Sequence, residues 1–357
     1  MTFGGGAAEI AAVHLSAYPL SLRAVDLTTV ADDEVVLHDG VVEHRHTGLE
    51  PDTAYRLDGH DVRTLTRPPG ERLSTVCTVN DVHFGEVECG ILNGVDDDPV
   101  YTTAPGDEPY PELMNRCAVA DIRAVDPDAV VVKGDLTSMG TRAEYQAFLN
   151  AYGPPFGDRL LHVRGNHDAY HGQDFASRAP LATTLPGVIL AVIDTAVPGR
   201  AGGGVSTDTL AWLDQLAADA DRPVMVFGHH HAWDPGSAQR PEAYFGINPD
   251  DSERLVEIVA RRPRIAGYFA GHTHRNRVRR FAATGDVPWV EVACVKDFPG
   301  AWAEYRVHEG GILQVFRRIS APEALAWSEK TRDLYGGLYG MYAFGELKDR
   351  CFAFAGA

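Results

Sequence analysis

Residues 160–168 read LLHVRGNHD, a short and mostly apolar run followed by glycine and three polar residues. The apolar part, 160–163, is typical of a buried β-strand, so Gly-Asn-His-Asp would leave the carboxyl end of that strand. Ligand sites of open α/β sheets gather at such strand ends. The segment therefore predicts a polar site at one rim of a layered α/β fold.

Four further motifs follow predicted strands in the same way. They are Asp81-Val82-His83, Gly134-Asp135, Gly228-His229-His230 and Gly271-His272-Thr273-His274. Strands of one sheet bring residues that are far apart in sequence to a common rim, so the polar side chains of all five motifs are expected to converge.

Apolar strands alternate with amphipathic helices between residues 74 and 319, which favours two sheets with helices outside them. The strand candidates are residues 74–80, 129–133, 160–163, 188–193, 223–227, 265–270, 289–293 and 312–316. Thr141 and Glu144 form a capping box at the start of one helix. Ser206 or Thr207 is expected to cap a second helix, and Ser252 a third.

We expect three regions along the chain. Residues 1–73 contain short β-type runs, and LEPDTAY at 49–55 resembles the tyrosine corner of fibronectin-type sandwiches, so a small β-rich domain is predicted. Residues 74–319, which carry the five motifs, are predicted to form the main domain. Residues 320–357 form a C-terminal extension, with a helix and an aromatic tail that is expected to pack on the main domain. A homodimer contact or a flap over the site is the alternative for this tail.

The formal net charge is −18, with 50 acidic and 32 basic residues, which argues against a broad nucleic-acid-binding face. The five cysteines show no C-x-x-C spacing, so neither a disulfide framework nor a thiolate zinc site is expected. The N-terminus does not have the pattern of a signal peptide, and no apolar run is long enough to span a membrane. A cytoplasmic location is therefore the default.

Seven side chains in the motifs carry donor atoms that bind metals. They are Asp81, His83, Asp135, Asn166, His229, His272 and His274. Carboxylate and amide oxygens together with imidazole nitrogens suit divalent or trivalent Mn, Fe or Zn ions. Seven donors exceed the needs of one ion and are enough for two that share a carboxylate. Two ions about 3.5–4 Å apart can hold a bridging hydroxide that attacks a phosphate ester in line.

Three further histidines are candidates for contact with a substrate. His167 directly follows the ligand candidate Asn166, so its ring can enter the site without binding metal and can act as a general acid. His230 and His231 either touch the substrate or form a polar rim, and both interpretations remain open. Lys296 and Asp297 follow a strand end, where solvated loop charges are favoured over substrate contacts.

The order of the five motifs resembles that of the calcineurin-like metallophosphoesterase superfamily, over roughly Thr75 to Ala293. The resemblance implies a four-layer α/β/β/α sandwich with two metal ions. It assigns Asp81, His83 and His274 to one ion and Asn166, His229 and His272 to the other, with Asp135 as the bridge. It also implies that His167 is the catalytic histidine and that Asp168 orients it.

Residues 194–212 are similar to a loop and helix of class III cyclic nucleotide phosphodiesterases. The resemblance implies hydrolysis of a small phosphodiester, such as a cyclic nucleotide or a glycerophosphodiester. The prolines that usually follow His-His in those enzymes are missing here, and residues 86–110 form a longer loop than usual. A phosphomonoesterase, a nuclease using the short basic run at 275–280, and a non-catalytic scaffold are the alternatives.

Overall fold

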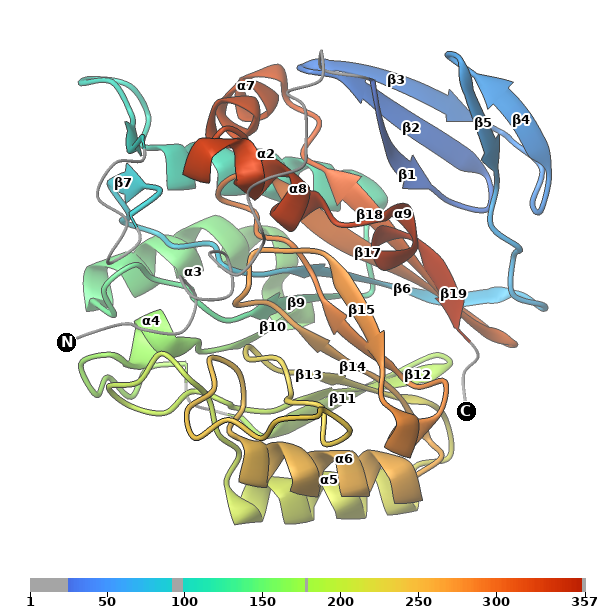
Figure 1. The fold of residues 1–357 in the computed structure, drawn as a ribbon, viewed down its shortest axis with the longest axis vertical. Helices are drawn as coiled ribbons and strands as arrows, with labels where there is room; N and C mark the ends of the chain where they lie inside the picture. Colours follow the sequence, from blue (N-terminus) through green and yellow to red (C-terminus); the bar gives the residue numbers. More distant parts are fainter. Residues whose placement is uncertain (1–24, 92–98, 177–178, 355–357) are drawn as a thin grey trace.

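A computed structural model describes residues 25–91, 99–176 and 179–354. Two six-stranded sheets lie between two layers of helices (Figure 1). The first sheet contains, in spatial order, β10 (Leu160–Val163), β9 (Ala129–Lys133), β6 (Arg72–Val79), β17 (Ala301–His308), β18 (Gly311–Arg318) and β19 (Phe352–Phe354). The second contains β11 (Leu181–Leu185), β12 (Val188–Val192), β13 (Val224–Phe227), β14 (Ile265–Ala270), β16 (Pro288–Glu291) and β15 (Arg277–Arg280).

Alternation along each strand explains the layers of the second sheet. Leu190 and Val192 of β12 point into the apolar core between the two sheets, whereas Ile189 and Ala191 join a second core against the helices. Side chains two residues apart share one face of a strand, so a strand that is apolar at every position is buried on both faces. Helices α5 (Thr207–Asp219) and α6 (Pro249–Arg261) cover the outer face (Figure 1).

The first sheet is covered on its outer face in the same way. Val130 and Val132 of β9 pack with Met114 and Ile122 of α2 (Tyr110–Val125) and with Phe148 of α3 (Arg142–Phe156). Helices α7 (Pro322–Thr331) and α8 (Leu338–Phe344) add to this layer. Three apolar cores thus separate four layers, and the predicted α/β/β/α sandwich is confirmed.

Two of the three predicted helix caps are confirmed. Thr141 accepts a hydrogen bond from the backbone of Glu144 in a full capping box, and Ser206 caps α5. The prediction for Ser252 is wrong, because Asn248 caps α6 and Ser252 lies inside that helix. Asn248 is followed by proline at the first helical position, where the missing N–H costs nothing.

The N-terminal region forms small separate sheets. Strands β1 (Asp26–Val30), β2 (Glu34–Asp39) and β3 (Val42–Thr47) form one sheet, and β4 (Ala54–Leu57) pairs with β5 (His60–Arg63). The hydroxyl of Tyr55 accepts a hydrogen bond of 2.8 Å from the backbone of Glu50, as in the expected tyrosine corner. Residues 1–24 and the acidic triplet 96–98 lie outside the described residues, and the two domain boundaries stay predictions.

The C-terminal region packs on the main domain. Strand β19 pairs with β18 at the edge of the first sheet, and Tyr339, Phe352 and Phe354 are buried. All five cysteines are buried free thiols, as expected from their spacing. Within the described ranges, no helix has the length and apolar character needed to cross a membrane.

Candidate metal centre

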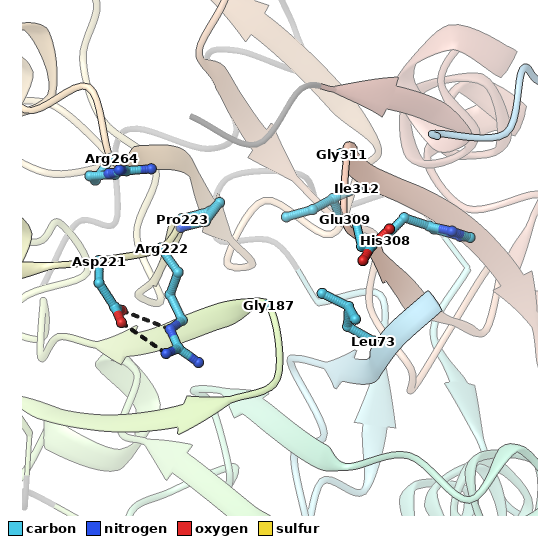
Figure 2. A pocket seen from close by; sticks show the side chains of 10 residues that line it. All are labelled: Leu73, Gly187, Asp221, Arg222, Pro223, Arg264, His308, Glu309, Gly311 and Ile312. Carbon is cyan, nitrogen blue, oxygen red and sulfur yellow. Dashed lines mark hydrogen bonds and ion pairs between the residues drawn. The ribbon is translucent and has the colours of Figure 1, made fainter. Parts of the chain in front are cut away.

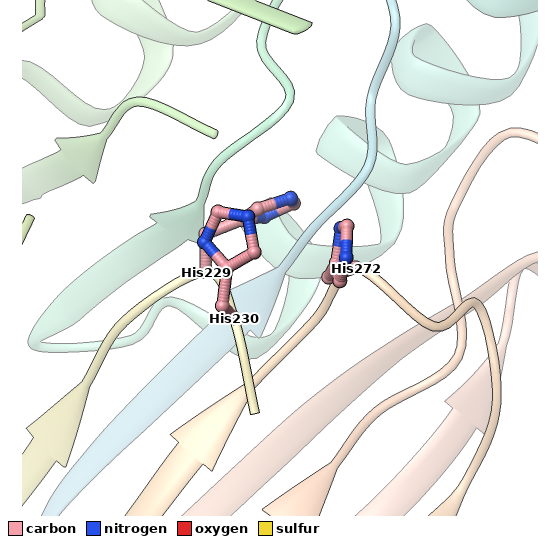
Figure 3. Close-up of side chains that lie close together, drawn as sticks. All are labelled: His229, His230 and His272. Atoms are coloured by element: carbon pink, nitrogen blue, oxygen red, sulfur yellow. The ribbon is translucent and has the colours of Figure 1, made fainter. Parts of the chain in front are cut away.

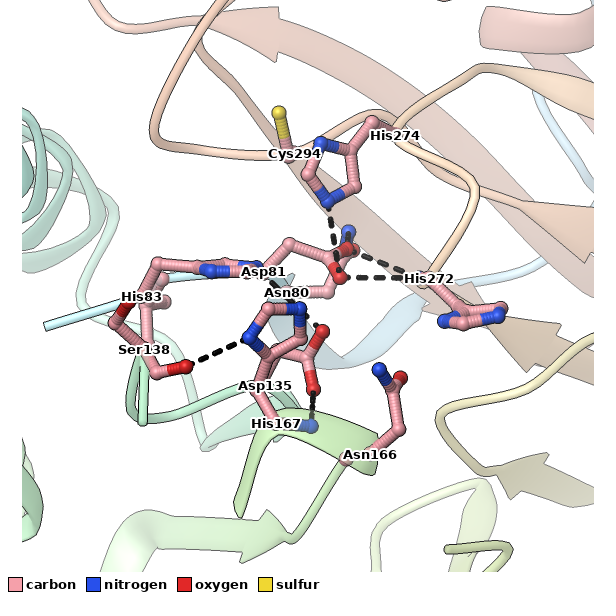
Figure 4. Close-up of polar contacts among 12 residues, drawn as sticks. Asn80, Asp81, His83, Asp135, Ser138, Asn166, His167, His272, His274 and Cys294 are labelled. Atoms are coloured by element: carbon pink, nitrogen blue, oxygen red, sulfur yellow. Dashed lines mark hydrogen bonds and ion pairs between the residues drawn. The ribbon is translucent and has the colours of Figure 1, made fainter. Parts of the chain in front are cut away.

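The seven predicted ligands converge at the carboxyl ends of five strands. Loops after β6, β9, β10, β13 and β14 carry them to one rim, and Figure 4 labels six of them. The donor atoms of the two aspartates and four histidines form overlapping groups within 4.8 Å, and Asn166 lies beside His229. Asp81 and Asp135 lie at the middle of this cluster and are 0% and 2% exposed. The structure therefore brings together the side chains that the sequence places far apart.

Three histidines direct the same ring nitrogen towards these two carboxylates. Oδ2 of Asp135 lies 3.5 Å from Nε2 of His83 and 3.3 Å from Nε2 of His229. Nε2 of His274 lies 3.5 Å from Oδ1 of Asp81. The spacing leaves room for cations that would be bound by nitrogen and oxygen donors together.

The other ring nitrogen of each of these histidines faces an acceptor. Nδ1 of His83 lies 3.1 Å from Glu86 and Nδ1 of His274 lies 3.6 Å from Asp297, while His229 Nδ1 lies 2.8 Å from the backbone carbonyl of Lys133. Such acceptors keep the proton on Nδ1 and leave the lone pair of Nε2 for a metal.

Asn166, after β10 of the first sheet, and His272, after β14 of the second sheet, complete the cluster. Oδ1 of Asn166 lies 3.0 Å from Nε2 of His229. Nε2 of His272 lies 2.9 Å from the carbonyl oxygen of Phe245, which leaves Nδ1 as the free donor atom of that ring.

His230 and His231 have different surroundings. The ring of His230 lies beside those of His229 and His272 (Figure 3), but its Nδ1 lies 2.9 Å from the hydroxyl of Thr195 and its Nε2 3.1 Å from the carbonyl of Ala201. Thr195 and Ala201 therefore occupy both ring nitrogens of His230, and these contacts join the loop after β13 to the loop after β12. His231 is buried near His272, and neither of its ring nitrogens has a hydrogen-bond partner among the described residues.

His167 lies against the cluster from the first turn of α4 (Asn166–Ala169). Its ring centroid is 4.5 Å from that of His83, and its Nδ1 lies 2.7 Å from the carbonyl oxygen of Ser138. Its backbone N–H donates to Oδ1 of Asp135. The carbonyl fixes the ring and leaves Nε2 free to exchange a proton.

Asp168 has a different position from the one expected. Its carboxylate accepts hydrogen bonds from the backbone of Leu136, Thr137 and Gly165 and from the hydroxyl of Thr137. The acceptor for the ring of His167 is therefore Ser138, while Asp168 joins the loop of Asp135 to that of Asn166. Burial first, and then the charge of Asp135, raise the pKa of Asp168 to about 6.

The backbone of the site is strained. Five of the seven predicted ligands have positive φ, namely Asp81 (54°), His83 (46°), Asp135 (49°), His272 (69°) and His274 (53°). Such residues cost of the order of 1–3 kcal/mol each and persist where the surrounding structure fixes them. Gly165 shows how tightly this part packs, because a Cβ atom there would lie 2.2 Å from Oδ1 of Asp135.

Three charged residues behind the ligands were not predicted as part of the site. Nζ of Lys296 lies 3.0 Å from both Glu86 and Asp297. The side chains of Lys296 and Asp297 are buried, and that of Glu86 is mostly buried. The expectation that Lys296 and Asp297 are solvated is therefore wrong. Tyr339 of α8 donates a hydrogen bond to Asp297, so the C-terminal extension covers these charges.

The cluster attracts positive charge. Burial alone would lower the pKa of His229, but the neighbouring carboxylates of Asp135 and Asp81 more than offset it and raise the pKa to about 9. Burial lowers the pKa of Lys133 to about 7, against the opposing effect of Asp81. The carboxylates of Asp81 and Asp135 are buried, and few cationic side chains of the protein are available to balance their charge. Such carboxylates favour the binding of metal ions, so the donor set fits a binuclear centre.

A pocket of about 230 Å³ lies elsewhere, at the opposite ends of the strands (Figure 2). Leu73, Gly187, Arg222 and His308 are among the residues that line it. Arg222 donates two hydrogen bonds to Asp221, so this charge is already paired. The predicted ligands all lie at the other rim.

Comparison with known proteins agrees with the geometry. Residues 74–276 match the family model of calcineurin-like phosphoesterases. The chain is 32% identical over 172 residues to a glycerophosphodiester phosphodiesterase, GpdQ, of Enterobacter lignolyticus, covering 42% of this chain and 56% of that protein. It is 30% identical over 187 residues to a cAMP/cGMP dual specificity phosphodiesterase of Mycobacterium tuberculosis, covering 49% and 56%. The chain thus spans about half the length of these curated relatives.

The fold is also similar to that of a dimetal phosphatase from Danio rerio, with a TM-score of 0.53, 15% identity, and coverage of 68% of this chain and 96% of that one. The family match covers more than half of the chain and includes all five strand-end motifs. With the motifs gathered at one rim of a four-layer sandwich, this chain belongs to the calcineurin-like phosphoesterase family.

Proposed function

We propose that this protein hydrolyses a small phosphodiester with a pair of metal ions. The observation that carries the proposal is the position of Asp135, whose Oδ2 atom lies within 3.5 Å of Nε2 atoms from two different loops. A carboxylate placed between two nitrogen donors is suited to bridge two ions.

The residues divide into two sets around this bridge. Asp81, His83 and His274 would hold one ion, and Asn166, His229 and His272 the other, with Asp135 shared. Support comes from the distance of 3.5 Å between His274 and Asp81 and of 3.0 Å between Asn166 and His229. Manganese, iron and zinc all suit this mixture of donors.

A bound pair of such ions supplies Lewis acidity towards phosphate oxygens and lowers the pKa of water. The protein adds a proton donor and a fixed geometry. His167, held at Nδ1 by the Ser138 carbonyl, would give a proton from Nε2 to the leaving oxygen. Asp168 fixes the two loops that carry Asp135 and Asn166, which limits their movement during the reaction.

The charge distribution favours a small substrate over a nucleic acid. Arg275 and Arg279, from the one short basic run noted in the sequence, lie 3.0 and 3.5 Å from the buried carboxylate of Glu291. This pairing leaves less positive charge for a phosphate backbone. The names of the relatives from Enterobacter lignolyticus and Mycobacterium tuberculosis support glycerophosphodiesters and cyclic nucleotides as the substrate class.

The test compares bis(4-nitrophenyl) phosphate with 4-nitrophenyl phosphate, in the presence of Mn²⁺. The proposal predicts that the protein hydrolyses the diester faster than the monoester. It also predicts hydrolysis of a glycerophosphodiester or cyclic AMP in a second assay. Preference for the monoester would identify a phosphomonoesterase instead. Metal binding without turnover of any ester would favour a scaffold of the same fold.

A further inference from the structure

The amide of Asn166 has partners at both of its ends. Its Nδ2 donates a hydrogen bond of 2.6 Å to the hydroxyl of Tyr170, and its Oδ1 lies 3.0 Å from Nε2 of His229. Asn166 is the first residue of the short helix α4 and Tyr170 directly follows its end, still with helical backbone angles, so the two side chains four residues apart meet on one face. Asn166 is 3% exposed, so water does not readily replace these partners.

Only one orientation of this amide suits a metal. A cation between Asn166 and His229 needs a lone pair from each, and the carbonyl of Lys133 already directs the Nε2 lone pair of His229 to that place. The amide oxygen must then face the cation, and its NH₂ group must find an acceptor on the opposite side. The hydroxyl of Tyr170 is that acceptor.

We propose that Tyr170 is a positioning residue for the second metal position, and that its hydroxyl turns the oxygen of Asn166 towards the ion. The proposal rests on the proposed function, because it presumes an ion bound by Asn166 and His229. Tyr170 stays outside the set of ligands and acts through Asn166. Partners of this kind typically contribute a factor of roughly 10–100 to metal affinity.

The variant Tyr170→Phe removes the hydroxyl and keeps the ring, which lies 4.8 Å from the ring of His167. Without the acceptor, the buried NH₂ group loses its partner and the amide is free to turn its nitrogen towards the ion. We expect one of two Mn²⁺ sites to weaken by roughly 10–100-fold while the other keeps its affinity.

The experiment is calorimetric titration of metal-free protein with Mn²⁺, checked by the electron paramagnetic resonance signal of a coupled Mn²⁺ pair. Tyr145→Phe is the matched control, because the hydroxyl of Tyr145 contacts His162 at 2.9 Å, away from the cluster. This control should bind both ions like the wild type. Circular dichroism verifies that each variant is folded.

A double-mutant cycle separates positioning from general packing. In an Asn166→Ala background, Tyr170→Phe should cause no further loss of affinity, because the group that it positions is absent. Two unchanged affinities in Tyr170→Phe, equal weakening of both sites, or a full additional loss in the Asn166→Ala background would overturn this inference. A wild-type protein that binds no pair of Mn²⁺ ions would instead overturn the proposed function.

Discussion

Nε2 of His229 lies 3.3 Å from Oδ2 of Asp135, although the two residues follow strands of different sheets, β13 and β9. The centre therefore spans the two halves of the sandwich, and its geometry depends on the packing between the sheets. Replacements in this cluster should affect metal binding before they affect the overall fold.

The variant Asp135→Asn should bind neither metal ion tightly and should lose turnover. The amide cannot supply the negative charge and the two shared lone pairs that a bridging carboxylate supplies. Elemental analysis of reconstituted protein measures the loss. Asp158→Asn, which changes an exposed aspartate on the surface, is the control and should keep full metal content and activity.

The variant His167→Ala should keep nearly normal metal content and lose a factor of about 10²–10⁴ in the rate of diester hydrolysis, because the proton donor is removed and the ligands remain. Metal analysis and steady-state kinetics on one preparation separate the two effects. The control His171→Ala alters an exposed histidine four residues away and should have no effect. Loss of metal from His167→Ala would mean that this histidine is itself a ligand.

The variant Glu86→Gln should weaken metal binding by roughly 10–100-fold, because Oε2 of Glu86 lies 3.1 Å from Nδ1 of His83 and orients that ring. It also removes one charge beside Lys296. Titration with Mn²⁺ measures the affinity. Glu108→Gln changes an exposed pair with Arg116 and should leave the affinity unchanged; equal affinities in both variants would show that Glu86 does not support the site.

The variant Arg306→Ala should lower the free energy of unfolding by about 3 kcal/mol, because it removes a buried cation that pairs with Asp32, Glu34 and Glu304, while Arg67 and Arg317 still pair with them. The guanidinium of Arg306 donates hydrogen bonds to Asp32, Glu34 and Glu304, joining the N-terminal sheet to β17. Urea denaturation provides the measurement. Arg56→Ala, in an exposed pair, should cost about 0–1 kcal/mol, and similar losses in the two variants would refute a structural role for the buried cluster.

The alternation of apolar strands and amphipathic helices predicts two sheets with helices outside them, and the four layers come from the family resemblance. The ligand candidates are predicted to converge because each motif directly follows a run of apolar residues. Val188–Val192 is an example, since an uninterrupted apolar strand has to be covered on both faces. Strand β17 was missed because Glu304 and Arg306 give it a polar face. That face is buried only because the N-terminal region brings Asp32 and Glu34 to it.

The charged residues behind the ligands are also hard to predict, because a part of the chain that is distant in sequence buries them. Lys296 and Asp297 look like solvated loop charges in the sequence, and they are buried because α7 and α8 return over the site from the end of the chain. The predicted loop at 86–110 ends where helix α2 begins, although Pro109 and Pro111 stand at that start. Proline at the first helical turn is in fact compatible with a helix start.

Anomalous diffraction from crystals of Mn²⁺-reconstituted protein would test the paired-metal centre. We predict two manganese peaks, one on each side of the Asp135 carboxylate, the first among Asp81, His83 and His274 and the second among Asn166, His229 and His272. A single peak, or peaks that Asp135 does not touch, would contradict a bridged pair of ions.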